Sequence, residues 1–330
     1  MVTLLRNIAR SRIAIPSAIL ISIVLTLLTI IRRPEMLSFT PIDYKLWSWA
    51  MFLNGTPYGG ICLNYLLILF EGWGIFKISE GFSLTHSRTN FPFIMYLLFQ
   101  ISNPRLQYLS EGSAVALIML PIIAMLFLTY QKPDATREGF IVGILSGMLF
   151  ILWNKSLLYY PLIIIGFWNM RSLNLKTFLS TLLGLAAIFW MQFIYLFWTD
   201  QLGMFTEPFV DLFQFQLIQF ESLPIGLIIH IAVIGLTTLI ALIYLIVSNF
   251  QEKVRIQASY NLFILTFFFA IAGILVDSGN LPGHLTIFYI TSAFLSANIL
   301  TKVQTKATLV LFFIITGGLL SSYILNLWSN

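Results

Sequence analysis

Long runs without a charged residue dominate this sequence. The clearest are Ile13–Ile31, Thr177–Trp198 and Ile225–Val247, and similar runs recur along the whole chain. A helix needs about 20 mainly apolar residues to cross the hydrocarbon core of a bilayer, which is about 30 Å thick. Only 9% of the residues are charged, whereas soluble domains carry about 25%. The sequence therefore predicts an all-α polytopic transmembrane helix bundle, built as a single integral membrane domain over residues 1–330, and excludes a soluble enzyme.

The ends of these runs predict about 11 spans or partial spans. They are Ile13–Ile31, Cys62–Ile78, Phe91–Ile101, Gly112–Thr129, Phe140–Trp153, Leu157–Met170, Thr177–Trp198, Ile225–Val247, Leu262–Val276, Leu285–Leu300 and Leu309–Leu327. The predicted inner loops hold most of the 18 Lys and Arg residues, and the predicted outer side holds only Arg32, Arg33, Lys45, Arg105 and Lys155. Because basic residues favour the cytoplasmic side, we expect the N-terminus inside the cell and the C-terminus outside.

Two predicted hairpins contain helices too short to cross a bilayer at right angles. Phe91–Ile101 has 11 residues, and a helix of that length reaches only about 16 Å. Phe140–Trp153 and Leu157–Met170 would each reach about 21 Å. The tip of each hairpin carries one cation, Arg105 in the first and Lys155 in the second. We expect both cations at or partly below the outer surface, where they would bind a lipid phosphate.

Acidic residues are expected on the same side. Asp43 lies in the Trp-rich first outer loop, Glu111 follows the first hairpin tip, and Asp277 and His284 bracket the last outer turn. If the short helices pack side by side, these groups share one outward-facing cavity with the two cations. A carboxylate near two cations suits a reaction in which it deprotonates an acceptor while the cations hold a phosphate leaving group.

A purely structural interpretation remains open for each of these residues. Arg105 could extend its guanidinium group, and Lys155 its ammonium group, to lipid phosphates without a catalytic role. Asp43 could cap the interfacial helix expected after Pro41.

No established motif for catalysis or metal binding is present. The sequence lacks a P-loop, a dinucleotide-binding glycine pattern, a nucleophile elbow and a paired-histidine metal motif. The three histidines are far apart in sequence, so no metal site is predicted. His230 lies within a span, where it is either packed and hydrogen-bonded or faces a cavity. The basic residues are scattered singly between apolar runs, so no nucleic-acid binding is expected, and membrane lipids are the predicted contacts.

Three glycines recur at intervals of four residues, at Gly139, Gly143 and Gly147. This spacing places them on one helix face and lets a second helix backbone approach closely. We expect tight packing of the second hairpin there.

The layout resembles the C-type (GT-C) glycosyltransferases, polytopic enzymes that use polyprenyl-phosphate sugars on the outer side of the membrane. The resemblance covers residues 13–200 and leaves 201–330 as additional C-terminal helices. It rests on the first outer loop with Asp43, the Gly139–Gly147 run, Asn154-Lys155, Leu157–Gly166, and the Thr177–Trp198 span followed by Asp200. It implies Asp43 as the catalytic base, Arg105 and Lys155 as ligands of the lipid phosphate, and a polyprenyl-phosphate lipid as cofactor or substrate.

The chain also resembles an inner-membrane protein family of Bacteroidetes over most of its length. The matching stretches are Ser87–Phe93, Gly139–Gly143, Met170–Asn174 and His284–Thr286. The resemblance implies a multi-pass protein of the bacterial cytoplasmic membrane. Some members are described as carotene oxygenases, but that chemistry needs four histidines around iron, and this chain has 3.

Two functions therefore follow as hypotheses. The first is a glycosyltransferase in which Asp43 is the base, Arg105 and Lys155 hold the phosphate, and Glu111, Asp277 or His284 support the acceptor. The second is a non-catalytic membrane subunit that docks protein partners of a membrane complex. An ion-coupled transporter ranks third, because Glu71 is nearly the only charge within the spans and no inverted repeat is detectable.

Overall fold

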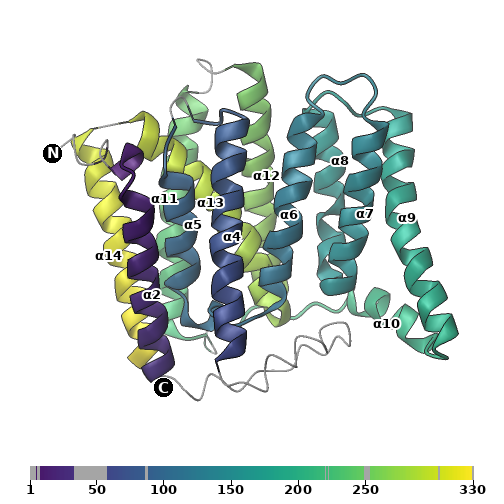
Figure 1. The fold of residues 1–330 in the computed structure, drawn as a ribbon, viewed down its shortest axis with the longest axis horizontal. Helices are drawn as coiled ribbons and strands as arrows, with labels where there is room; N and C mark the ends of the chain where they lie inside the picture. Colours follow the sequence, from purple (N-terminus) through teal and green to yellow (C-terminus); the bar gives the residue numbers. More distant parts are fainter. Residues whose placement is uncertain are drawn as a thin grey trace.

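In the computed structural model every regular element in the described part of the chain is a helix, and no strand is present there (Figure 1). The structure describes residues 5, 8–32, 58–85, 88–219, 221, 223–248, 253–303 and 305–328. The prediction of an all-α helix bundle is confirmed.

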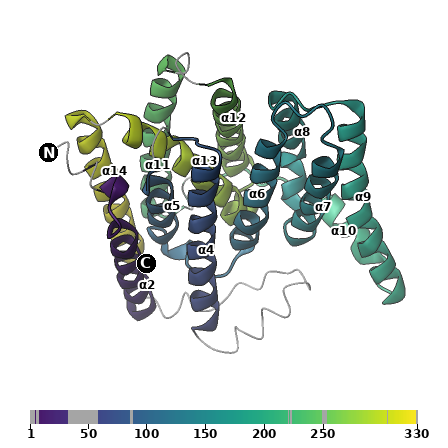
Figure 2. The same ribbon diagram turned by 45° about the horizontal axis from the view of Figure 1, so that its top comes forward.

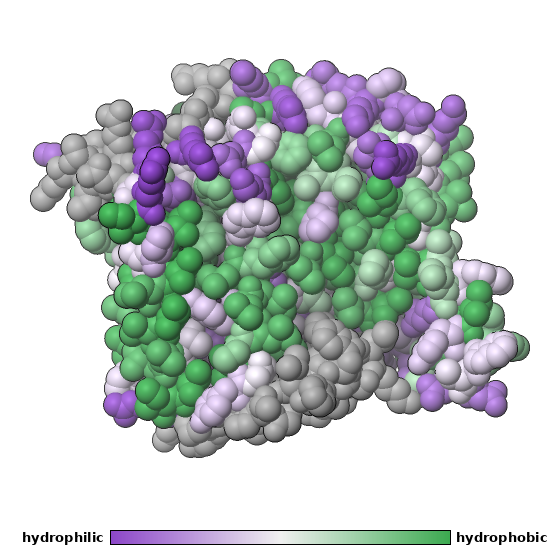
Figure 3. Space-filling view, viewed as in Figure 1, coloured by the Kyte–Doolittle hydropathy of each residue, from purple (hydrophilic) through white to green (hydrophobic). Residues whose placement is uncertain are grey.

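Eight of the described helices are long and apolar enough to cross a membrane. They are α2 (Ala14–Arg32), α4 (Gly59–Gly81), α6 (Glu111–Leu128), α9 (Leu175–Trp198), α11 (Ile225–Ser248), α12 (Val254–Val276), α13 (Leu281–Lys302) and α14 (Lys306–Trp328). Apolar side chains cover the middle of the molecular surface, and hydrophilic ones gather along its upper edge (Figure 3). Such an apolar girdle suits contact with lipid, so the chain is a multi-pass membrane protein.

The remaining elements are shorter. They are α5 (Phe91–Ile101), α7 (Thr136–Leu152), α8 (Tyr160–Asn169), α10 (Gly203–Asp211) and the 3-10 turns η3 (Pro104–Leu106), η4 (Asn154–Tyr159) and η7 (Ser278–Asn280). The predicted boundaries of α5 are correct. The predicted helix Leu157–Met170 is wrong at its start, because the chain first forms η4. Pro161 then fixes the first turn of α8.

Helix α13 forms the centre of the bundle and packs against α5, α6, α11 and α12. Its membrane-spanning window is 100% buried, whereas the other candidate spans are between 28% and 67% buried. It also has the lowest mean hydropathy of the eight, 1.3. Neighbouring helices therefore keep its many polar side chains away from lipid, where they would be costly.

The glycine motif of α7 allows the predicted close approach of another helix backbone, but the partner is α9, which follows the second hairpin and is not part of it. A Cβ atom on Gly143 would overlap the carbonyl oxygen of Thr181, and one on Gly184 would overlap that of Phe140. The two backbones can approach this closely only because both positions lack a side chain. In both ribbon views α7, α8 and α9 form one side of the molecule, while α2 and α14 form the other (Figure 2).

The short turns η3, η4 and η7 share one end of the bundle with α10, the lower end in Figure 1. The loop 129–135 and the loop 170–174 lie at the opposite end. Our predicted orientation makes the lower end the outer one.

Candidate functional site

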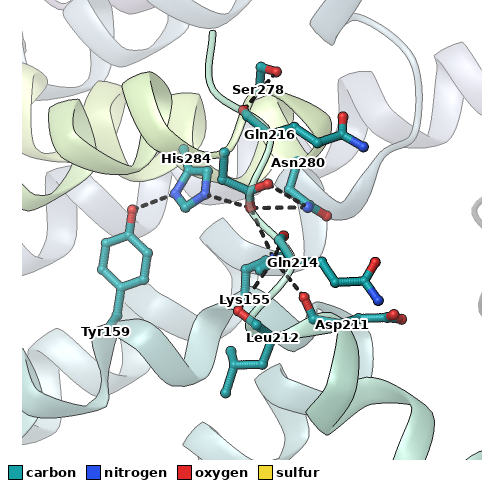
Figure 4. Close-up of polar contacts among 10 residues, drawn as sticks. Lys155, Tyr159, Asp211, Leu212, Gln214, Gln216, Ser278, Asn280 and His284 are labelled. Atoms are coloured by element: carbon teal, nitrogen blue, oxygen red, sulfur yellow. Dashed lines mark hydrogen bonds and ion pairs between the residues drawn. The ribbon is translucent and has the colours of Figure 1, made fainter.

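Lys155 is enclosed at the end of the bundle that is lower in Figure 1. It lies on η4, where α7 has ended and the extended residue Trp153 turns the chain back. Its side chain is 3% exposed. The Nζ atom donates hydrogen bonds to the carbonyl oxygens of Asp211, at 2.7 Å, and Gln214, at 2.5 Å (Figure 4). A third carbonyl oxygen, that of Leu212, lies 3.4 Å away.

Asp277 supplies the negative charge opposite this ammonium group. It follows the last residue of α12, and its side chain is also 3% exposed. Its Oδ2 atom lies 3.8 Å from Nζ of Lys155 and 3.4 Å from Nε2 of His284. The amide nitrogen of Asn280 donates to the same oxygen at 3.0 Å. The carboxylate therefore has three polar neighbours.

His284 connects this carboxylate to a buried tyrosine. The Nδ1 atom of His284 lies 2.7 Å from the hydroxyl of Tyr159, so both ring nitrogens are engaged. The indole of Trp153 meets the imidazole edge-on, with ring centroids 5.0 Å apart. Gly283 allows this contact, because a Cβ there would stand 2.5 Å from Cε2 of Trp153. We name the five residues Lys155, Tyr159, Asp277, Asn280 and His284 the Lys155 cluster.

The chain between α10 and α11 covers the Lys155 cluster. The backbone of Ile218 donates to the carbonyl of Leu275 at 3.0 Å, and that of Ser278 donates to Gln216 at 2.9 Å. The ring of Phe215 lies 4.8 Å from the Lys155 ammonium, within range of a cation–π contact. Residues 211–218 thus form a cover that is held both by Lys155 and by the end of α12.

The structure brings together some of the predicted site residues. Lys155, Asp277 and His284 are in contact. Glu111 lies in the first turn of α6, which packs against α13. Arg105 lies on η3 at the same end and is exposed. Asp43 lies outside the described residues.

In this structure Lys155 does not present its charge to the surrounding bilayer, and its role as a phosphate ligand stays a prediction. Its ammonium group is surrounded by backbone oxygens and Asp277, so it does not reach a lipid phosphate in this structure. The physical reason is the cover formed by residues 211–218, which supplies acceptors closer than the membrane surface. The side chain of Arg105 is exposed, and its role as a phosphate ligand stays a prediction.

The sequence left two alternatives for His230, a packed side chain or one that faces a cavity. In the structure the side chain is packed. It is buried, its Nδ1 lies 3.3 Å from the hydroxyl of Ser322, and its ring meets Tyr289 edge-on at 5.4 Å.

Tyr159, Asn280 and the cover were not predicted from the sequence. Tyr159 stands in an apolar hairpin with no motif around it, and no motif marks residues 211–218 as a cover. Among the described residues, no group of His, Cys, Asp and Glu could hold a metal ion.

No family model, no curated protein and no solved structure matches the chain. The arrangement of the Lys155 cluster is therefore the main support for a functional proposal.

Proposed function

We propose that this membrane protein is a glycosyltransferase that moves a sugar from a polyprenyl-phosphate carrier to an acceptor at the outer membrane face. One observation carries the proposal: Lys155, Asp277 and His284 come from separate parts of the chain and meet at one end of the bundle. Ionisable groups enclosed in a membrane protein are costly and commonly serve binding or catalysis.

The proposed reaction uses these charges to stabilise a leaving phosphate. An acceptor oxygen attacks the anomeric carbon, the bond from that carbon to the phosphate oxygen breaks, and the lipid phosphate leaves with the bonding electrons. Asp43 takes the acceptor proton, while Arg105 and Lys155 neutralise the phosphate. Glu111, Asp277 and His284 hold the acceptor and Lys155 in position.

Substrate binding requires Lys155 to exchange its partners. In the closed arrangement three backbone carbonyls of the cover receive its hydrogen bonds. Phosphate oxygens carry a full negative charge, so a charge-assisted hydrogen bond to them is the stronger one. The lipid phosphate would thus displace the cover from the ammonium group.

The test is consumption of a polyprenyl-phosphate-linked hexose by the purified protein in lipid nanodiscs, followed by mass spectrometry of released polyprenyl phosphate. Asp43→Asn should reduce the rate by about 10²-fold or more, the usual contribution of a general base. Asp200→Asn changes an exposed acid at the same end and should leave the rate unchanged. Full activity of Asp43→Asn would remove Asp43 from its role, and absence of both turnover and bound lipid phosphate would remove the enzyme hypothesis.

A non-catalytic membrane subunit is the second candidate, and a specific observation favours it. The Lys155 ammonium group is fully occupied by the chain's own carbonyls and Asp277, which suits a structural clamp. In that case protein partners should co-purify at fixed stoichiometry from native membranes, the purified protein should show no sugar transfer, and Lys155→Met should lose stability.

A further inference from the structure

A second polar site lies inside the bundle, away from the Lys155 cluster. Glu71 stands near the middle of α4 and is 1% exposed. The described ion pairs do not include it. A carboxyl group buried at this depth is expensive unless it is neutralised, and in membrane proteins such a residue usually has a function.

Within the described part of the chain, one oxygen of Glu71 has a hydrogen-bond partner and the other has none. The hydroxyl of Tyr96 donates to Oε2 at 2.7 Å, and the side-chain amide of Gln100 donates to that hydroxyl at 2.9 Å. The Oε1 atom is buried with no partner among the described residues. Gln100 thus donates to Tyr96, and Tyr96 donates to Oε2 of Glu71. These two hydrogen bonds hold Oε2 in place and do not involve Oε1.

Glu71 borders a narrow polar cavity. The cavity has a volume of about 10 Å³, which is room for one water molecule. Its polar lining consists of Asn64, Glu71, Gln100, Ser110, Ser113 and Thr286. The amide oxygen of Asn64 accepts from the hydroxyl of Ser113 at 2.5 Å, and its amide nitrogen donates to the carbonyl of Leu106 at 2.9 Å. A water here would have the two to four partners that buried water needs.

These polar groups form a column that leads from the outer end to the middle of the membrane. Ser110 caps the start of α6, and Ser113 is one turn further along. Asn64 and Glu71 are seven residues apart on α4, and thus about 10 Å apart along its axis. A single metal ion could not contact both ends of the column. The one water for which the cavity has room and the hydroxyl groups of Ser110 and Ser113 can together relay a proton between Glu71 and the start of α6.

The helices packed around Glu71 supply no cation near it. Helix α5 has no charged residue, and its only titratable side chain is Tyr96. Helix α6 contributes only Glu111, at its first turn. Helix α13 contributes His284, which is bound to Asp277 and Tyr159, and Lys302 at its opposite end. On α4 itself, Lys77 is paired with Glu80. These helices therefore place no positive charge beside Glu71, and a bound proton is what can neutralise its carboxyl group.

We propose that Glu71 is a proton-binding site that exchanges its proton with the predicted outer side through the polar column of Asn64, Ser110 and Ser113. The Oε1 atom releases its proton to water in the cavity, which leaves the carboxylate with the Tyr96 hydrogen bond on Oε2. Rebinding reverses the step, and no other bond changes. This site is separate from the proposed sugar transfer, so either can fail without the other.

Infrared difference spectroscopy of the purified protein in lipid tests this proposal. Between low and high pH, the wild type should lose the C=O stretch of one protonated carboxyl group, and Glu71→Gln should lack that band. Tyr96→Phe should shift the band frequency, because the hydroxyl that donates to Oε2 is gone. Glu207→Gln, an exposed acid on α10, serves as the control and should keep the band unchanged. Absence of a titrating band that depends on Glu71, or its suppression by Na⁺ at constant pH, would overturn the assignment.

Exchange into D₂O tests the route. In the wild type the Glu71 band should shift rapidly after mixing, whereas Ser113→Val places a methyl group where the hydroxyl was and should slow the shift at least tenfold. Leu236→Val, on a lipid-exposed face of α11, should exchange at the wild-type rate. An equal rate in Ser113→Val would show that the proton leaves Glu71 by another path.

Discussion

At the scale of single residues, the charges of Lys155 and Asp277 depend on each other. Each side chain is 3% exposed, so each has lost nearly all of its water. The stability of such a pair comes from mutual compensation, and removal of one partner leaves the other as an uncompensated buried charge. The cover over Lys155 depends on the same ammonium group, since three of its carbonyl oxygens face that atom.

Replacing Lys155 by Met should therefore lower the free energy of unfolding by roughly 3 kcal/mol. Chemical denaturation in detergent measures it. The matched control is Lys132→Met, because Lys132 pairs with Glu138 at 2.8 Å while remaining 46% exposed; a loss below about 1 kcal/mol is expected there. The double variant Lys155→Met with Asp277→Asn should recover part of the loss. Equal effects at the two lysines would contradict a buried pair.

The hydroxyl of Tyr159 gives a smaller and separable effect. Tyr159→Phe removes the partner of His284 Nδ1, and loss of one buried hydrogen bond should cost about 1 kcal/mol of unfolding free energy. Tyr195→Phe alters a side chain that is 65% exposed and should be neutral within error. Thermal unfolding of both variants measures this difference. An unchanged unfolding free energy in Tyr159→Phe would mean that this hydrogen bond adds no stability.

The candidate site was only partly predictable at this scale. Lys155 stood out as a single cation in an apolar hairpin, and Asp277 and His284 stood out as polar residues in an outer turn. Their contact depends on how α7, α12 and α13 pack, which local sequence does not encode. Tyr159 lacked any signal, because a tyrosine beside apolar residues is also what a membrane interface favours.

At the scale of elements, hydropathy predicted where the helices lie but not which one is central. Most apolar runs match the long helices within four residues, since the thickness of the bilayer sets their length. The predicted span Leu262–Val276 is wrong at its start, because α12 already begins at Val254. The central place of α13 is visible only in retrospect, from its low mean hydropathy of 1.3. Pro161 shows how a single residue can set a helix boundary. It lies in the first turn of α8, which begins after the turn η4, whereas hydropathy alone predicted a helix from Leu157.

The α7–α9 pair should be sensitive to one added methyl group. Gly143→Ala places a Cβ against the carbonyl oxygen of Thr181, and because a backbone atom cannot rotate away, the helices must separate. The expected loss in unfolding free energy is about 1–3 kcal/mol. Gly317→Ala is the control, since a Cβ there has nothing within 4 Å. A thermal shift assay compares the two variants, and equal melting temperatures would refute close contact at Gly143.

At the scale of the whole molecule, the orientation of the bundle decides which compartment meets the Lys155 cluster. The cluster shares its end of the bundle with η3, η7 and α10 (Figure 1). The opposite end bears many hydrophilic side chains (Figure 3), and the basic residues there favour the cytoplasm. Both proposals, sugar transfer and proton exchange, use the outer side, so they share this one requirement.

Labelling across α9 tests that orientation directly. Cys62 is the single cysteine, so Cys62→Ser gives a background without thiols. Lys176→Cys, at the start of α9, and Glu207→Cys, on α10 beyond its other end, then introduce one exposed thiol on each side. In right-side-out vesicles a membrane-impermeant maleimide should label Glu207→Cys at once and Lys176→Cys only after permeabilisation. The reverse pattern would place the Lys155 cluster in the cytoplasm, and immediate labelling of both would mean that α9 does not cross the membrane.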